Sequence, residues 1–149
     1  MRLAVVVAAV LALGTIPASA QDAARGEQAF KKCVACHAVG ENAKTKVGPV
    51  LNDVFGRTAG TLADYKYSKA MIGVGEGGLV WTHETLFEYL HKPNEMVKGT
   101  KMAFAGIKSD EEINDLLAYL QTFSPDYVAA AGGEEEGEDS DEGEEGGGK

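Results

Sequence analysis

Cysteine is scarce in this sequence, which has only Cys33 and Cys36 among its 149 residues. In an exported chain two cysteines would ordinarily suggest one disulfide. A bridge across so short a loop would constrain little of the unfolded chain, so a structural disulfide explains the pair poorly. Histidine is scarce too, with three residues, and a zinc site would need further cysteine or histidine ligands at suitable spacings. The two thiols therefore need another explanation.

The sequence also lacks a long apolar run. The apolar stretch at residues 3–13 falls short of the ~20 residues that span a bilayer, and nothing resembling a second span follows. Arg2 precedes this stretch and the small residues 18–20 follow it, which is the pattern of a secretory signal. We therefore predict a cleaved signal peptide at residues 1–20 and a mature chain that begins at Gln21. A membrane anchor is the competing interpretation.

Most of the formal net charge of −9 belongs to the C-terminal end. Residues 133–149 hold nine acidic residues against Lys149, a net charge of −8, whereas residues 21–132 carry −2. The C-terminal segment has no apolar residue and cannot bury enough surface to offset the entropy of ordering. We predict a disordered acidic tail at residues 129–149. Residues 21–128 have the length of one domain.

Helical patterns dominate this domain. The clearest helix begins at Ser109, whose spacing to Glu112 is that of a capping box, and it ends before Pro125. Apolar residues at helical spacing predict its buried face, namely Ile113, Leu116, Leu117 and Leu120. Another helix begins at Thr82 and ends before Pro93. It is expected to bury Leu86, Phe87 and Leu90.

A first helix is predicted from Asp22, as its N-cap, to about Ala35, with Glu27 and Lys31 spaced for an ion pair. The glycine-punctuated stretches between the helices, at residues 39–65 and 73–79, show no strand alternation. Loops this long are unusual in a compact domain unless something organises them. A large buried prosthetic group would give them an apolar surface to wrap around.

The motif at residues 33–37, Cys-Val-Ala-Cys-His, accounts for the two thiols. It is the attachment pattern of c-type haem, in which each thiol adds to a vinyl group and the adjacent histidine lies beneath the iron. Positions i and i+3 lie on one helix face, so Cys33 and Cys36 can reach one porphyrin edge. The alternatives are a chance Cys-x-x-Cys and a thioredoxin-like redox pair. The latter needs a βαβ context, which this sequence lacks.

Several further stretches are distinctive: Val47-Gly48-Pro49, Phe55-Gly56-Arg57, Trp81, Glu88-Tyr89-Leu90, residues 99–107 (GTKMAFAGI) and residues 115–120 (DLLAYL). With the Cys-x-x-Cys-His motif, they make residues 22–123 resemble the class I cytochromes c, in particular the bacterial c2 type, which is similar to mitochondrial cytochrome c. The resemblance implies an all-α cytochrome c fold. Three main helices, short helices and long loops would wrap around one covalently bound haem c.

The identity of the second axial ligand decides the chemistry, because an open position permits ligand binding or peroxide chemistry and a filled one favours outer-sphere electron transfer. From the residues alone Met71, Met96 and Met102 are all candidates. The resemblance implies His37 and Met102 as the iron ligands, since the family places its axial methionine in this Gly-Thr-Lys-Met loop. Ligation by two histidines is not expected, because solvent-facing positions explain His83 and His91.

The resemblance also implies the surroundings of the haem. The His37 N–H would donate to the carbonyl of Pro49, with Gly48 allowing the backbone to approach. Arg57, Tyr67 and Trp81 match positions that bind a buried propionate. Tyr89 and Thr100 match partners near the methionine sulfur, and Gly26 and Phe30 match the crossing of the terminal helices. Met71 and residues 73–78 depart from the mitochondrial pattern.

We therefore predict an electron-transport protein of the periplasm rather than an enzyme, with a haem enzyme or gas binder as the alternative. The resemblance implies a cytochrome bc complex as donor and a terminal oxidase or photosynthetic reaction centre as acceptor. We expect a monomer that docks peripherally on membrane complexes and binds no nucleic acid. Lysines predicted to frame the haem edge are Lys31, Lys32, Lys46, Lys92, Lys98, Lys101 and Lys108. Acidic residues predicted to form the opposite pole of a dipole are Asp110, Glu111, Glu112 and Asp115.

Overall fold

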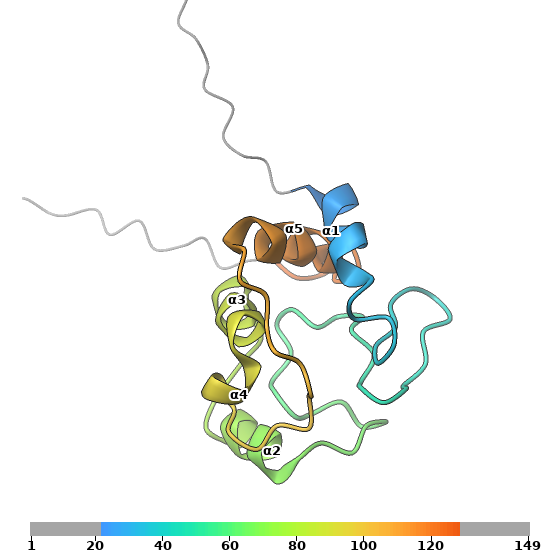
Figure 1. Cartoon of the computed structure of the whole chain (residues 1–149). Coiled ribbons are helices and arrows are strands. Elements are labelled where there is room, and N and C mark those ends of the chain that lie inside the picture. Colours follow the sequence, from blue (N-terminus) through green and yellow to red (C-terminus); the bar gives the residue numbers. More distant parts are fainter. Residues whose placement is uncertain (1–21, 129–149) are drawn as a thin grey trace, which may run out of the picture.

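The computed structural model describes residues 22–128, and these are built from helices and long connecting loops (Figure 1). The helices are α1 (Ala23–Phe30), α2 (Lys69–Glu76), α3 (His83–His91), α4 (Pro93–Met96) and α5 (Asp110–Gln121). Within the described residues there is no strand, and the single isolated β-bridge pairs Thr58 with Val80. The predicted all-α fold is confirmed.

The predicted signal peptide, residues 1–20, and the predicted acidic tail, residues 129–149, lie outside the described residues. Between residues 22 and 128 no helix has both the length and the apolar character needed to cross a membrane.

The N-caps predicted for the three main helices, Asp22, Thr82 and Ser109, are confirmed. In each, a side-chain oxygen accepts a hydrogen bond from a backbone N–H of the first turn, which would otherwise have no partner in the helix. The capping box predicted for α5 forms by half. The Ser109 hydroxyl accepts from the Glu112 N–H at 3.2 Å, but the Glu112 carboxylate pairs with Lys32.

The predicted end of the first helix was wrong, because α1 ends at Phe30 and not near Ala35. The chain continues in tighter turns with hydrogen bonds between residues three apart, including one from the Cys33 N–H to the Phe30 carbonyl at 2.7 Å. The predicted Glu27–Lys31 ion pair is also absent, and the Lys31 ammonium donates to the side chain of Gln28. Because α1 ends at Phe30, the residues that follow it form turns instead of a further helical turn.

Helix α2 was not predicted, and it takes up part of a stretch that was expected to be a loop. Gly73 and Gly75 lower helix propensity, so the sequence pattern did not indicate a helix here. The helix is stabilised by its cap, because the Ser68 hydroxyl accepts a hydrogen bond from the Met71 N–H at 3.1 Å. Met71 and Gly75 are then buried against the rest of the domain.

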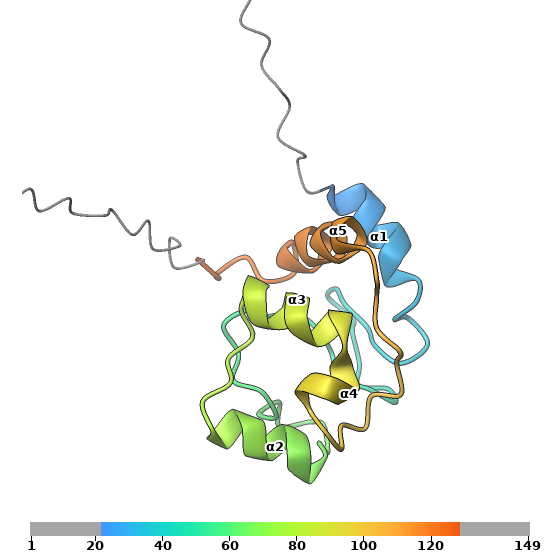
Figure 2. The same ribbon diagram turned by 60° about the vertical axis from the view of Figure 1, so that its left-hand side comes forward.

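Helices α1 and α5 lie together at one end of the domain and α2 lies at the other, with α3 and α4 between them (Figures 1 and 2). The α1–α5 contact depends on Gly26, where a Cβ would lie 1.9 Å from the carbonyl oxygen of Asp115. The rings of Phe30 and Tyr119 pack with centroids 5.5 Å apart. The buried residues predicted for α5 are confirmed, whereas in α3 Phe87 is half-buried and Tyr89 takes its place in the core.

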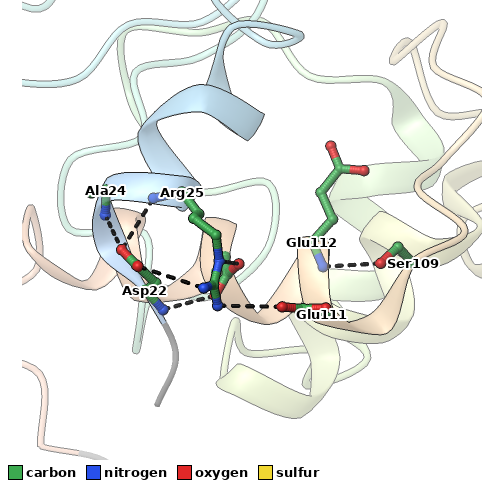
Figure 3. A network of polar contacts seen from close by, with 7 residues as sticks. Asp22, Ala24, Arg25, Ser109, Glu111 and Glu112 are labelled. Carbon is green, nitrogen blue, oxygen red and sulfur yellow. Dashed lines mark hydrogen bonds and ion pairs between the residues drawn. The ribbon is translucent and has the colours of Figure 1, made fainter. Parts of the chain in front are cut away.

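An ion-pair network that was not predicted joins α1 to α5 (Figure 3). The Asp115 side chain is 6% exposed and accepts from Arg25 Nε at 2.7 Å and from the Asp22 backbone N–H at 2.7 Å. Arg25 also pairs with Asp22 at 3.6 Å and with Glu111 at 3.4 Å. The hydrogen bond from Arg25 holds the pKa of Asp115 below its usual value, against the opposing effect of burial.

This lowered pKa predicts how the Asp115→Asn variant depends on pH. We expect the variant to unfold more easily than the wild type at pH 7, where the carboxylate is ionised. This difference in stability will shrink as the pH falls from about 4, the pKa of aspartate in the unfolded chain, to the lower pKa of Asp115 in the folded protein. The reason is that only the ionised carboxylate stabilises the folded state, and it becomes protonated over this range. Denaturant unfolding at a series of pH values measures this. Glu111→Gln is the control, because its exposed carboxylate is expected to contribute little, and a pH-independent difference would refute the prediction.

Candidate functional site

A cavity of about 250 Å³ lies among α1, α2, α3, α5 and the loops between them. The predicted site residues that line this cavity are Cys33, Cys36, His37, Pro49, Arg57, Tyr67, Trp81, Tyr89, Thr100 and Met102. They include every residue assigned to the site from the sequence, although they span seventy positions of the chain. Much of the remaining wall is apolar and includes Phe30, Leu51, Val54, Met71, Leu86, Leu90, Phe104, Leu116 and Leu120.

The two cysteines sit in a tight turn that follows α1. The backbone N–H groups of Cys36 and His37 both donate to the carbonyl of Cys33, at 3.0 and 2.8 Å. Both thiols are free and half-buried. Burial raises the pKa of Cys33 to about 11, so this thiol is protonated at neutral pH. A redox-active cysteine pair needs a stabilised thiolate, so the environment does not favour the thioredoxin-like alternative.

His37 is held in one orientation by the backbone beneath it. Its Nδ1 donates to the Pro49 carbonyl at 2.7 Å, which leaves Nε2 with its lone pair. A Cβ at Gly48 would lie 2.5 Å from Cε1 of the imidazole, so this close approach requires glycine. Burial lowers the pKa of His37 despite the hydrogen bond to Pro49. The imidazole is therefore neutral at pH 7, which is the form that binds a metal.

Arg57, Tyr67 and Trp81 bring polar groups to an otherwise apolar part of the cavity wall. Arg57 donates to the carbonyls of Asn52 and Val50 at 3.2 and 3.3 Å. Burial lowers its pKa, but a guanidinium remains charged in a protein. Burial also raises the pKa of Tyr67, which stays a neutral hydroxyl. Trp81 is 7% exposed and lines the cavity.

The loop between α4 and α5 carries Met102 and is fixed to α3 by hydrogen bonds. The Tyr89 and Thr100 hydroxyls are 3.0 Å apart, and the Met102 N–H donates to the Thr100 hydroxyl at 3.2 Å. Tyr89 is buried against Trp81, with ring centroids 5.0 Å apart, and burial raises the pKa of its hydroxyl. These contacts fix the loop at residues 99–104, the Met102 loop, against the cavity wall.

Some of the candidate iron ligands line the cavity and others do not. Met71 and Met102 line it, whereas Met96 packs half-buried elsewhere in the core. Neither His83 nor His91 lines the cavity. The solvent-facing position expected for His91 was wrong, because the side chain is half-buried and its Nδ1 bonds the Ile107 carbonyl at 2.7 Å.

Comparisons with known proteins identify relatives of this chain. The family model described as Cytochrome c matches residues 23–124. The chain is 49% identical to cytochrome c2 of Blastochloris viridis over 117 residues, which cover 78% of this chain and 90% of the relative. It is 56% identical to cytochrome c2 of Agrobacterium tumefaciens over 99 residues, covering 66% of this chain and 89% of the relative. The solved structure of cytochrome c2 from Rhodospirillum centenum matches with a TM-score of 0.65 at 43% identity, covering 70% of this chain and 99% of that one.

The helical fold and the Cys-x-x-Cys-His motif at the wall of an apolar cavity define a c-type cytochrome, and the chain belongs to the cytochrome c family. Within that family it is an electron carrier of the cytochrome c2 type and not an enzyme.

Family membership implies a covalently bound haem c, and the cavity residues fit this group. The wall offers the thiols of Cys33 and Cys36, the imidazole of His37 with its Nε2 lone pair, and the indole N–H of the buried Trp81. When bound, the haem supplies a one-electron iron couple. The sequence missed much of the apolar wall, including Leu51 and Val54, because these loop residues show no periodic pattern.

Proposed function

We propose that this chain is an exported, periplasmic carrier of single electrons. Its one haem c would be attached through Cys33 and Cys36, with His37 and Met102 as iron ligands. The observation that carries this proposal is that these four side chains, from two distant segments, line one cavity. With His37 and Met102 holding the iron, the haem would supply electron transfer without a site for a substrate.

The other cavity residues would orient the ligands and bind the propionates. The Pro49 carbonyl would fix the His37 tautomer and make the imidazole a better donor to iron. Arg57 supplies a half-buried positive charge, and Tyr67 and Trp81 supply hydrogen-bond donors, which suits a carboxylate taken out of water. Tyr89 and Thr100 would hold the Met102 loop through their mutual hydrogen bond.

The rim of the cavity supports docking to acidic partners. Lys101 brings a positive charge to the cavity wall, whereas Lys32, which also lines the cavity, is paired with Glu112. The exposed apolar residues Val34 and Val47 lie on the segments that carry the motif and Gly48. The Lys46 ammonium donates to the Val34 carbonyl at 2.8 Å, so its charge belongs to the same rim. We propose a cytochrome bc complex as the donor and a terminal oxidase or photosynthetic reaction centre as the acceptor.

The acidic face predicted on α5 is smaller than expected. Asp115 is buried and paired with the exposed Arg25, and the Glu112 carboxylate pairs with Lys32, so neither carries a free negative charge on that face. Steering would therefore depend mainly on the basic rim.

Electron exchange with membranes that contain a cytochrome bc complex tests this function. We expect the second-order rate to fall by roughly tenfold as ionic strength rises from low to physiological, because salt screens the attraction between the basic rim and an acidic partner. Lys46→Gln is expected to slow the rate at low salt. Lys92→Gln is the control, because Lys92 pairs with Glu95 and does not line the cavity. A rate that does not respond to salt, or that responds equally to both variants, would contradict docking through this rim.

A further inference from the structure

Met71 is a buried methionine at the site that has no role in the proposed function. Its side chain is 7% exposed and lines the same cavity as Met102. It lies in the first turn of α2, where the Ser68 hydroxyl accepts its backbone N–H and fixes the start of the helix. A buried thioether at a cofactor cavity can control which other groups enter it.

Two contacts tie the start of α2 to the Met102 loop, defined here as residues 99–104. The Lys101 ammonium donates to the carbonyl of Lys66 at 2.6 Å, across 35 positions of the sequence. A Cβ on Gly99 would lie 3.4 Å from the Cβ of Ala70, so the loop backbone touches the first turn of α2. Met71 is therefore next to the residue that the Met102 loop packs on, and it reaches the cavity from that side.

The polar groups of this part of the cavity already have partners. The hydroxyls of Tyr89 and Thr100 bond one another, and Thr100 also accepts from the Met102 N–H. The Met71 thioether adds no strong donor or acceptor to them. A water molecule there would find few polar partners, and a water needs two to four of them to be stable in a protein interior.

We propose that Met71 is a positioning residue that keeps the Met102 loop closed over the cavity. Its apolar side chain does so by excluding water from the space behind this loop. The inference rests on the proposed ligation of iron by Met102. A closed loop leaves little room for an external ligand to displace the methionine. A polar side chain at residue 71 would stabilise the hydrated, open loop and lose a favourable contact in the closed one.

Imidazole binding to the oxidised holoprotein measures loop opening, because imidazole binds iron only where Met102 has left it. We expect Met71→Asn to raise the affinity for imidazole by at least about fivefold, since burying an unpartnered amide disfavours the closed state by this much or more. Met71→Leu keeps the wall apolar and is expected to stay within about twofold of the wild type by the same argument. On heating Met71→Asn, the red-region absorption band of the sulfur–iron bond is expected to disappear at a lower temperature than the helical circular dichroism signal. On heating Met71→Leu, the band and the helical signal are expected to disappear together.

Met96→Asn is the matched control, because Met96 is a half-buried methionine that does not line the cavity. It is expected to lower overall stability without raising imidazole affinity. If Met71→Asn does not accumulate as holoprotein, Met71→Ala removes the wall without adding an amide and carries the same expectation. An imidazole affinity equal to that of the wild type, or raised equally by Met96→Asn, would overturn the role of Met71. Absence of the red-region band from the wild type would instead refute the ligation by Met102.

Discussion

Met102→Ala is expected to lose the red-region band and to lower the reduction potential by a sizeable part of the ~0.8 V range that axial ligands cover. The thioether favours reduced iron, so its removal stabilises the oxidised form. Met102 is the methionine in the loop that Thr100 and Tyr89 orient at the cavity. The reduced variant is also expected to bind carbon monoxide, whereas the reduced wild type is not, because Met102 would already occupy that position on the iron. Redox titration and absorption spectra with and without carbon monoxide measure both effects.

Met96→Ala is the control for Met102→Ala. Met96 is half-buried in the core outside the cavity, so its truncation is expected to lower stability and leave the band in place. A Met102→Ala variant that keeps both the band and the wild-type potential would show that another residue binds the iron. The double variant with Met71→Leu would then identify it, because Met71 is the second methionine that lines the cavity.

The double variant Cys33→Ala, Cys36→Ala is expected to lose its haem completely on extraction with acidified organic solvent, whereas the wild type keeps its colour. No covalent link remains once both thiols are gone. Loss of the group would leave an apolar cavity of about 250 Å³. Its apolar wall would then face water, and losing this burial removes a large part of the marginal stability of a small domain. We therefore expect the stripped chain to lose its helical circular dichroism.

The single variants Cys33→Ala and Cys36→Ala are the controls for attachment. Each keeps one thiol at the cavity and is expected to keep its colour through extraction, with a lower unfolding midpoint than the wild type. Colour that is stripped from the wild type itself would exclude covalent attachment.

The main features of the fold could be predicted where hydrogen bonds and periodicity are local. Asp22, Thr82 and Ser109 begin helices because each caps backbone groups within its own first turn. The buried face of α5 follows from spacing along one helix. Helix α2 escaped prediction, because its glycines argue against a helix locally and its burial depends on contacts with other segments.

The ion pairs of charged residues could not be predicted either when the partners lie far apart in the sequence. Asp115 looks like one of several acidic residues on an exposed helix face, and nothing in its neighbourhood along the sequence indicates burial. Its partner Arg25 lies 90 positions away, and the pair forms only because Gly26 lets α1 cross α5 closely. A distant ion pair has no periodic signature, so its formation, and the pKa of Asp115, come from packing alone.

The sequence by itself predicts the attachment chemistry, because the Cys-x-x-Cys-His spacing is a local property of five consecutive residues. The resemblance, in turn, implied Met102 and its neighbours in the site. Only the tertiary structure decided which of the three methionines meet His37 at one cavity, and it placed Met71 there and Met96 outside. The physical reason is that the cavity wall is assembled from segments dozens of residues apart. Which side chains share that wall depends on how the helices and loops pack, and no local pattern encodes this.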